Sequence, residues 1–377
     1  MRKTSIVFLC VLVLFLSHGF TRQYVAVAKE DQHDFASAYC VVETKSGRVL
    51  QEGNKDKRLP MASTTKILTA ILVIENTQNL DELVEIPAEA VGIEGSSIYL
   101  KKGEHLSVRE LLLGLMIKSG NDAAVALAVH SFGSLENYQK AANKFVENLG
   151  LKNTNIVTPN GLHDDKHFTS AFDLAVISTY AMKNNIFREI VGTQKTTISN
   201  EFGKGRRVIK NKNKMLADYN GATGIKTGFT KKAGRCLVSS AERNGMELVC
   251  VVLNCQNWFK ESERLLNESF ATYKLVELVP EHFHVGSAKV LDGNKKTVNL
   301  VATKGFCYPL DSRELSNIQI ETKIKDNIVA PISRGDVLGE ILVYNKNNLI
   351  FSEKVYSIEE VESTKIKDII KKIWLNF

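Results

Sequence analysis

The sequence predicts an α+β protein: an antiparallel sheet flanked by helices and carrying an all-helical insert, then a small all-β domain and a C-terminal amphipathic helix. Strand patterns lie before residue 60 and return at residue 224, and the long stretch between them has helical periodicity. Short strands separated by turn residues then fill 283–356. At 377 residues, with 44% hydrophobic and 24% charged side chains, the chain suits two folded domains and is too long for one small domain.

The N-terminus has the features of an export signal. Arg2 and Lys3 precede an apolar run from Ile6 to Leu16, and Ala26-Val27-Ala28 places small residues where a signal peptidase cleaves. The run is shorter than the roughly 20 residues that a membrane-spanning helix needs. A cleaved signal over 1–28 is therefore the favoured interpretation, and an uncleaved anchor is the alternative.

The charge argues against a nucleic-acid-binding protein, and the cysteine content argues against a disulfide-stabilised fold. Cleavage would remove three basic residues and no acid, which lowers the formal charge from +7 to +4, too small an excess to indicate a nucleic-acid partner. An odd number of cysteines at irregular spacings would remain, so no disulfide framework is expected. Buried free thiols are expected at Cys40, Cys236 and Cys250.

The first elements follow in order. Ala36 to Glu43 predicts a strand, and Arg48 to Gln51 its hairpin partner. After Pro60 an apolar series predicts a helix whose first turn contains Ser63. Helical periodicity then dominates to about residue 200, which predicts the all-helical insert from the segments Leu111 to Lys118, Ala123 to His130, Tyr138 to Leu149 and Ala171 to Met182.

Strand patterns return at Gly224 to Thr227, Arg235 to Glu242 and Met246 to Asn254, and Asn244-Gly245 favours a hairpin between the last two. A helix from Trp258 to Leu278 is expected to end before Pro280. This organisation predicts four parts: a signal over 1–28, a first domain over 29–280, a small β domain over 281–356 and an amphipathic tail over 357–377.

Three short motifs carry the chemistry. Ser63-Thr64-Thr65-Lys66 places a hydroxyl and an amine on one face of a helix, where a neutral lysine could take the proton of the serine. Ser119-Gly120-Asn121 lies between two predicted helices, and Lys226-Thr227-Gly228 lies on a predicted strand, where Gly228 would let a ligand approach the backbone. Each motif alone also fits an ordinary helix start, linker or strand end.

Together and in this order, the motifs resemble those of serine penicillin-binding proteins and class A β-lactamases. Longer stretches narrow the resemblance to the low-molecular-mass D-alanyl-D-alanine carboxypeptidases, over about residues 35 to 377. It implies a β-lactamase/transpeptidase-like fold for the first domain. The stretches are Pro60 to Thr69, Lys118 to Ala126, Thr158 to Leu162, Phe168 to Leu174 and Gly221 to Leu237.

The resemblance implies a serine-type carboxypeptidase that acts on peptidoglycan stem peptides ending in D-Ala-D-Ala. Ser63 would attack the carbonyl of the penultimate D-alanine, and water would hydrolyse the acyl-enzyme. Lys66 would be the base, Ser119 would relay a proton to the leaving amine, and Lys226 would hold Ser119 and add positive charge.

The same resemblance implies the binding residues. Asn121 would hold the amide on the acyl side, while Lys226 and Thr227, next to Gly228, would contact the terminal carboxylate. The backbone N–H groups of Ser63 and Phe229 would form the oxyanion hole. Many relatives carry an arginine near this carboxylate, whereas the matching stretch here, Gln256 to Phe259, has none.

Two alternatives stay open. A class A β-lactamase has Ser-Asp-Asn and a deacylating carboxylate, but this chain has Gly120, and the nearest acids in its loop are Asp164, Asp165 and Asp173, the last expected to cap a helix. β-Lactam antibiotics are thus expected to acylate the protein and leave slowly. A catalytically silent penicillin-sensing or wall-binding protein is the other alternative.

No cofactor or metal is expected, because no metal-ligand spacing occurs; His163 and His167 are expected to be solvated loop residues.

The tail predicts a peripheral anchor at the outer face of the cytoplasmic membrane or the cell wall, with a helix docked on the β domain as the alternative. Its apolar stripe consists of Ile366, Ile369, Ile370, Ile373, Trp374 and Phe377, among Lys365, Lys367, Lys371 and Lys372.

Overall fold

The structure is a computed structural model that describes residues 35–200, 205–365 and 370–371. The predicted export signal lies outside the described residues, and so do residues 366–369 and 372–377 of the predicted tail. Within the described part of the chain, no helix is long and apolar enough to cross a membrane.

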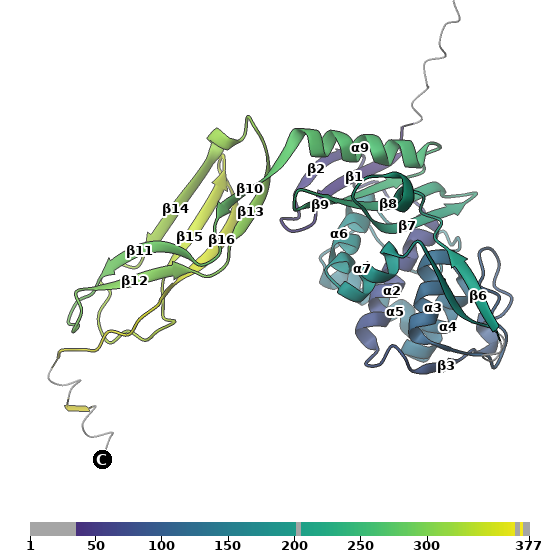
Figure 1. The fold of residues 1–377 in the computed structure, drawn as a ribbon, viewed down its shortest axis with the longest axis horizontal. Helices are drawn as coiled ribbons and strands as arrows, with labels where there is room; N and C mark the ends of the chain where they lie inside the picture. The colour runs from purple at the N-terminus through teal and green to yellow at the C-terminus, as the bar shows by residue number, and fades with distance from the viewer. Residues whose placement is uncertain (1–34, 201–204, 366–369, 372–377) are drawn as a thin grey trace, which may run out of the picture. The chain divides into compact units, whose positions relative to one another are not determined.

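The first domain is built on a five-stranded antiparallel sheet in the order β2-β1-β9-β8-β7 (Figure 1). The predicted first hairpin is confirmed, as is the turn at Asn244-Gly245, where both residues have positive φ. The central strand β9 is buried along its whole length because helices cover both faces of the sheet. The strands are β1 (Ala38–Glu43), β2 (Val49–Gly53), β7 (Ala222–Thr230), β8 (Gly234–Arg243) and β9 (Met246–Leu253).

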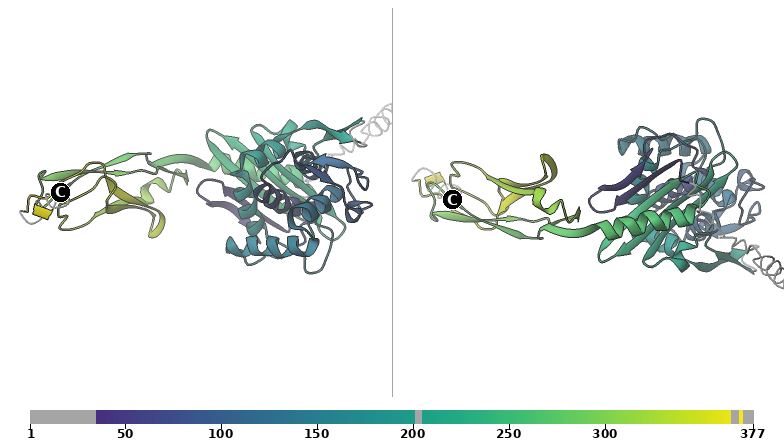
Figure 2. Two further views of the ribbon diagram at one scale, coloured as in Figure 1. Left: turned by 90° about the horizontal axis from the view of Figure 1, so that it is seen from below. Right: turned by 90° about the horizontal axis from the view of Figure 1, so that it is seen from above.

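Two apolar cores lie on opposite faces of this sheet. The larger core packs α6 against β1 and β9 and α2 against α6, and the smaller one packs α9 against β8 and β9 (Figures 1 and 2). The helices are η1 (Ala62–Thr65), α2 (Lys66–Asn76), η2 (Ala88–Ala90), α3 (Val108–Leu113), η3 (Gly114–Lys118), α4 (Asn121–Phe132), α5 (Leu135–Asn148), α6 (Ala171–Met182), α7 (Asn185–Gly192), α8 (Met215–Asp218) and α9 (Trp258–Thr272).

The insert is not all-helical, so that prediction was wrong in detail. The pair β3 (Leu83–Glu85) and β4 (His105–Ser107), and the hairpin of β5 (Lys195–Asn200) with β6 (Gly205–Lys210), lie among its helices. Strands of three residues are too short to show an alternating pattern in the sequence.

The helix expected to run to Leu278 ends at Thr272. The residues that follow form β10 (Tyr273–Val279), which pairs with β13 (Phe306–Asp311). Tyr273, Val276 and Val279 favour an extended chain once a partner strand is available. The helical spacing of Leu275 and Leu278 was therefore misleading.

The β domain contains a second antiparallel sheet in the order β11-β12-β16-β15-β14, as the broken strand pattern predicted. Its core reaches beyond residue 356, because Val361 is buried and residues 361 and 363 form bridges with Ile332 and Gly293. The predicted start of the tail at 357 was therefore too early. The remaining strands are β11 (Phe283–Lys289), β12 (Thr297–Ala302), β14 (Ile318–Ile324), β15 (Val337–Asn345) and β16 (Asn348–Ser357), with the short helix η4 (Leu315–Asn317).

The cysteines of the described residues are all free thiols. Cys40, Cys236 and Cys250 are buried as expected, and burial raises the pKa of the Cys40 and Cys236 thiols to about 12. These thiols stay protonated at neutral pH and act as small apolar side chains.

Candidate active site

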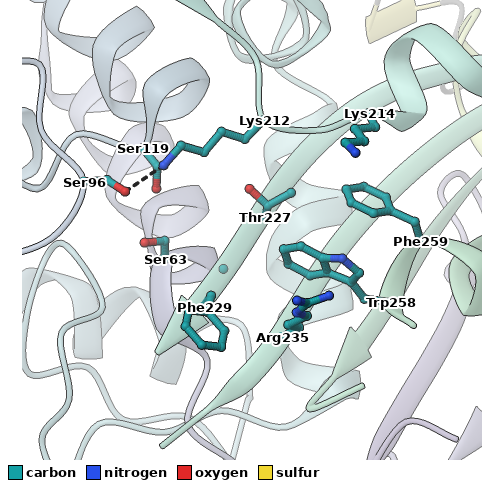
Figure 3. Close-up of a pocket in the computed structure, with 11 residues that line it drawn as sticks. Ser63, Ser96, Ser119, Lys212, Lys214, Thr227, Phe229, Arg235, Trp258 and Phe259 are labelled. Carbon is teal, nitrogen blue, oxygen red and sulfur yellow. Dashed lines mark hydrogen bonds between the residues drawn. The ribbon is translucent and has the colours of Figure 1, made fainter. Parts of the chain in front are cut away.

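An open pocket of about 550 Å³ lies where η1, β7 and the loop after η3 meet (Figure 3). The lining brings the three sequence motifs together, because Ser63, Ser119, Thr227, Gly228 and Phe229 all face it. Chain segments more than a hundred residues apart thus form one site. The other lining residues are Ser96, Lys212, Lys214, Arg235, Trp258 and Phe259.

Ser63 lies in a 3₁₀ turn and not in the first turn of an α-helix as predicted. Ala62, just before it, has a left-handed backbone with φ of 48°, which an alanine rarely adopts. Lys66 begins α2, and its Nζ lies 3.0 Å from Ser63 Oγ. The turn keeps the predicted hydroxyl–amine pair within hydrogen-bond distance.

Two fixed acceptors surround the amine of Lys66. Nζ lies 2.7 Å from Asn121 Oδ1 and 2.6 Å from the carbonyl oxygen of Asn160. The Asn121 amide is held in this orientation because its Nδ2 donates to Glu94 O at 2.5 Å. A neutral amine has two N–H donors, so both would point at these acceptors and leave its lone pair for Ser63.

Electrostatics favour this neutral amine. Lys66 is fully buried, and burial lowers the pKa of its ammonium well below the usual range; the positive charges of Lys226 and Lys212 lower the pKa further. Because Lys66 has no carboxylate hydrogen-bonded to it within the described residues, desolvation is not offset by an ion pair. The site is built to hold a base.

Lys226 is the second buried lysine. Burial, followed by repulsion from Lys212, lowers the pKa of Lys226 to about 7. Its Nζ donates to Thr227 O at 2.9 Å. The predicted hydrogen bond from Lys226 to Ser119 is not among the contacts of the described residues, although Lys226 still supplies charge next to the pocket.

Ser119 ends η3 in a left-handed conformation with φ of 68°, which turns its side chain into the pocket. Asp122, two residues after the glycine of this motif, anchors the neighbouring loop. Its carboxylate accepts hydrogen bonds from the Ile98 and Leu100 amides and from Ser97 Oγ. This loop carries Ser96 into the pocket wall, a contribution that the sequence motifs did not indicate.

Gly228 brings strand β7 against the nucleophile. A Cβ added at this position would lie 3.1 Å from Met61 O, Ser63 N and Thr64 N, all backbone atoms. The close approach therefore favours glycine, since any side chain would push these backbone atoms away. It places the backbone of Phe229 near that of Ser63, the pair of N–H groups predicted to form an oxyanion hole.

His167 is buried, which contradicts the prediction of a solvated loop residue. Its Nδ1 accepts from Val157 N at 2.9 Å, and its Nε2 lies 2.8 Å from Thr65 Oγ1. Burial lowers the pKa of His167 to about 4. The loop packs against η1, and that long-range contact takes the imidazole out of water.

The pocket also contains features that the motifs did not reveal. Lys212 Nζ donates to Ser96 Oγ at 2.7 Å across the pocket. Arg235 and Trp258 lie together on the Thr227 side, away from Ser63 and Ser119 (Figure 3). Trp258 also packs against the smaller core, so its side chain contributes both to that core and to the pocket wall.

Among the described residues, the pocket lining contains no carboxylate. Asp173, expected to cap α6, accepts instead from Asn153 N and Thr154 Oγ1, and the cap is Ser170. A main-chain carbonyl, Asn160 O, stands beside Lys66 in this loop. Within the described residues, no cluster of three or more histidine, cysteine or acidic side chains could hold a metal ion.

Two family models match successive parts of the chain. The family model described as D-alanyl-D-alanine carboxypeptidase, Peptidase_S11, matches residues 25–257. The model described as penicillin-binding protein 5, C-terminal domain, matches residues 273–363. The second match begins at β10, the strand that the sequence had suggested was the end of a helix.

Curated relatives match over nearly the whole chain. The D-alanyl-D-alanine carboxypeptidase DacF of Bacillus subtilis is 30% identical over 97% of both chains. DacC of Escherichia coli K12, also a D-alanyl-D-alanine carboxypeptidase, is 32% identical over 87% of this chain and 84% of its own.

Solved structures share the fold. Penicillin-binding protein 5 of Haemophilus influenzae has a TM-score of 0.74 at 28% identity, covering 88% of this chain and 98% of its own. PBP3 of Streptococcus pneumoniae, titled a peptidoglycan synthesis regulatory factor, has a TM-score of 0.75 at 25% identity, over 87% and 99% of the two chains. The fold is thus a transpeptidase-like α+β domain followed by a β-rich domain, and the chain belongs to the D-alanyl-D-alanine carboxypeptidase family of low-molecular-mass penicillin-binding proteins.

Proposed function

We propose that this serine-type D-Ala-D-Ala carboxypeptidase trims peptidoglycan stem pentapeptides through an acyl-enzyme on Ser63. The observation that carries the proposal is the arrangement around Lys66, where two fixed acceptors take the N–H groups and leave the lone pair for Ser63 Oγ, 3.0 Å away. A base of this kind is what a serine hydroxyl needs to become a nucleophile.

In the first step, Ser63 Oγ adds to the carbonyl carbon of the penultimate D-alanine while Lys66 Nζ takes the hydroxyl proton. The carbonyl oxygen becomes an oxyanion and accepts from the backbone N–H groups of Ser63 and Phe229. The close fit of Gly228 against Ser63 N supports this placement.

In the second step, the C–N bond breaks and the terminal D-alanine leaves. Its amine needs one proton, which passes from Lys66 through Ser119, whose side chain faces the same pocket. Water then adds to the acyl carbon, again losing a proton to Lys66, and the ester to Ser63 breaks. The products are free D-alanine and a tetrapeptide, and the enzyme returns to its starting state.

Asn121, Lys226 and Thr227 are the proposed substrate-binding residues. Asn121 would hold the backbone of the acyl part, since its side chain already lies beside Lys66. Lys226 and Thr227 would face the leaving D-alanine from β7. With its pKa of about 7, Lys226 carries partial charge at neutral pH and favours anionic ligands.

β-Lactams would acylate Ser63 in the same way and hydrolyse slowly. A class A β-lactamase uses a dedicated carboxylate to activate the deacylating water, and the described pocket lining has none, which leaves Lys66 alone for that step. We further propose export, cleavage after residue 28 and peripheral attachment to the outer face of the cytoplasmic membrane through the C-terminal tail. The sequence patterns of the N-terminus and of the C-terminal tail support these proposals.

The test is the Ser63→Ala variant. It should release no D-alanine from a stem pentapeptide and form no covalent adduct with benzylpenicillin in intact-protein mass spectrometry, while its thermal unfolding stays close to wild type. A penicillin adduct on this variant would assign the nucleophile elsewhere. Wild-type protein that binds penicillin but never releases D-alanine would instead support the penicillin-sensing alternative.

A further inference from the structure

Arg235 is a cation of the pocket wall with no acidic partner among the residues that the structure describes. Its side chain is exposed on β8, and no ion pair of the described residues includes it. Its hydrogen bond, from Nη1 to Gln256 O, is long at 3.4 Å. Because the pocket lining contains no carboxylate either, the guanidinium has free donors beside the site.

The sheet register places Arg235 on the face that Thr227 uses. Arg235 pairs with Phe229 across the β7–β8 ladder, and Thr227 precedes Phe229 by two residues. Side chains at alternate positions of a strand share a face, as do directly paired residues. Arg235 and Thr227 therefore lie on one face of the sheet, and both line the pocket.

Trp258 restricts where the guanidinium can lie. The Arg235 Cζ is 5.9 Å from the centroid of the Trp258 ring, within the range of a cation–π contact. Trp258 is itself fixed at the start of α9, against the smaller core. An aromatic platform of this kind reduces the entropy lost when an arginine binds an anion.

We propose that Arg235 is the specificity-determining residue that binds the free carboxylate of the substrate's terminal D-alanine, with Thr227 on the same face. This inference deepens the proposed function and rests on it. With the scissile carbonyl at Ser63, the terminal carboxylate lies one residue further along the substrate, within about 3.6 Å per residue of extended chain. The side of the pocket that holds Thr227, Arg235 and Trp258 is the side where the leaving residue is proposed to bind (Figure 3).

Lys214 and Lys212 are the competing cations of the pocket lining, and both carry an ammonium group instead of a guanidinium. Lys212 is also engaged elsewhere in the pocket. Its ammonium is hydrogen-bonded to Ser96 Oγ at 2.7 Å, next to Ser119 and across the pocket from Trp258 (Figure 3). A guanidinium presents parallel N–H donors that match both oxygens of a carboxylate, whereas an ammonium acts as a point charge. Arg235 thus has both the free donors and the position.

The experiment compares a peptide ending in D-Ala-D-Ala with the same peptide ending in D-Ala-D-alaninamide, which lacks only the terminal charge. We expect Arg235→Leu to lower kcat/KM for the acid roughly ten- to hundredfold, the effect of losing a hydrogen bond to a charged group, and to leave kcat/KM for the amide within about twofold. Arg235→Lys should retain part of the preference for the acid over the amide. Lys260→Leu removes an exposed cation outside the pocket lining and should leave both values unchanged.

If the role of Arg235 were merely structural, Arg235→Leu would lower kcat/KM equally for the acid and the amide, and that result would overturn the proposal. An unchanged acid-to-amide ratio in Arg235→Leu, or its loss in Lys212→Leu instead, would overturn it as well. The acylation rates of benzylpenicillin and its methyl ester give the same ratio without peptide turnover. If wild-type protein fails to release D-alanine, the proposed function is wrong. The comparison of benzylpenicillin with its methyl ester still decides the role of Arg235.

Discussion

His167 Nε2 lies 2.8 Å from Thr65 Oγ1, and this contact connects the loop before α6 to the turn that carries the nucleophile. The Nδ1 atom accepts from a backbone N–H, so the proton of the neutral ring lies on Nε2 and is donated to Thr65. Thr65 Oγ1 in turn donates to Ala62 O at 2.8 Å. The imidazole thus holds the left-handed Ala62 just before Ser63.

This contact predicts an acid-dependent loss of stability. Because the folded state lowers the pKa of His167 from 6.5 to about 4, its contribution is complete above pH 6.5 and is lost as pH falls towards 4. The loss is on the order of 3 kcal/mol from this residue. His167→Gln keeps an acceptor and a donor but cannot be charged.

Urea unfolding at pH 7.5 and pH 4.5 checks this prediction. Acidic groups also titrate over this range, so the difference between wild type and His167→Gln is the relevant quantity. The variant should lose less free energy of unfolding between the two pH values than wild type does. Equal losses would show that His167 is not held neutral.

Lys66→Arg should abolish acylation. A guanidinium stays protonated and cannot accept the Ser63 proton, and loss of a general base costs about a hundredfold or more in rate. The rate of benzylpenicillin acylation measures the effect. Since a larger side chain could disturb a fully buried site, Lys66→Met serves as a second variant without a base. Wild-type acylation rates in either variant would remove Lys66 from the mechanism.

Gly228→Ala should impair the site while leaving most of the fold intact. The added Cβ would press against Met61 O, Ser63 N and Thr64 N at 3.1 Å, and these backbone atoms cannot rotate away as a side chain could. We expect acylation to slow roughly tenfold as the strand and the turn separate by a few tenths of an ångström. Gly192→Ala is the matched control, because its Cβ would meet only Thr223 O at 3.5 Å.

Ser63, Lys66, Ser119 and Asn121 could be singled out from the sequence because each belongs to a short local motif. Arg235 has no such motif: it enters the pocket through its pairing with Phe229, a property of the sheet register. The burial of His167 likewise depends on a loop packing against η1, about a hundred residues earlier. Such contacts are set by tertiary packing, which a single sequence does not display.

The secondary structure shows the same difference between elements that local sequence predicts and elements that tertiary packing decides. Long elements such as α6 and β9 were predictable because each is a long, largely apolar run bounded by capping or turn residues. The helix α9 was predicted too long because Leu275 and Leu278 continue its spacing, whereas pairing with β13 decides that they form a strand. Local patterns cannot report a partner strand more than thirty residues away.

The last prediction concerns the C-terminal tail. The chain is attached to the β domain as far as Lys365, through Thr364 N donating to Asp292 O and an ion pair of 2.6 Å between Lys365 and Asp292. Deletion after Lys365 therefore removes the apolar stripe without disturbing these contacts. Residues 366–377 have isoleucines, tryptophan and phenylalanine at helical spacing among lysines, a pattern typical of a helix lying in a membrane interface.

We expect the protein with its tail to sediment with anionic vesicles and the version ending at Lys365 to stay in the supernatant, with both hydrolysing a small soluble peptide equally well. Vesicles of neutral lipid should bind the tail more weakly, because lysines attract anionic headgroups. Replacing Lys367, Lys371 and Lys372 by glutamine should reduce binding to the anionic vesicles towards the neutral-lipid level. Equal sedimentation of the long and short versions would instead favour a tail that packs on the protein itself, since the vesicle contact would then come from another surface.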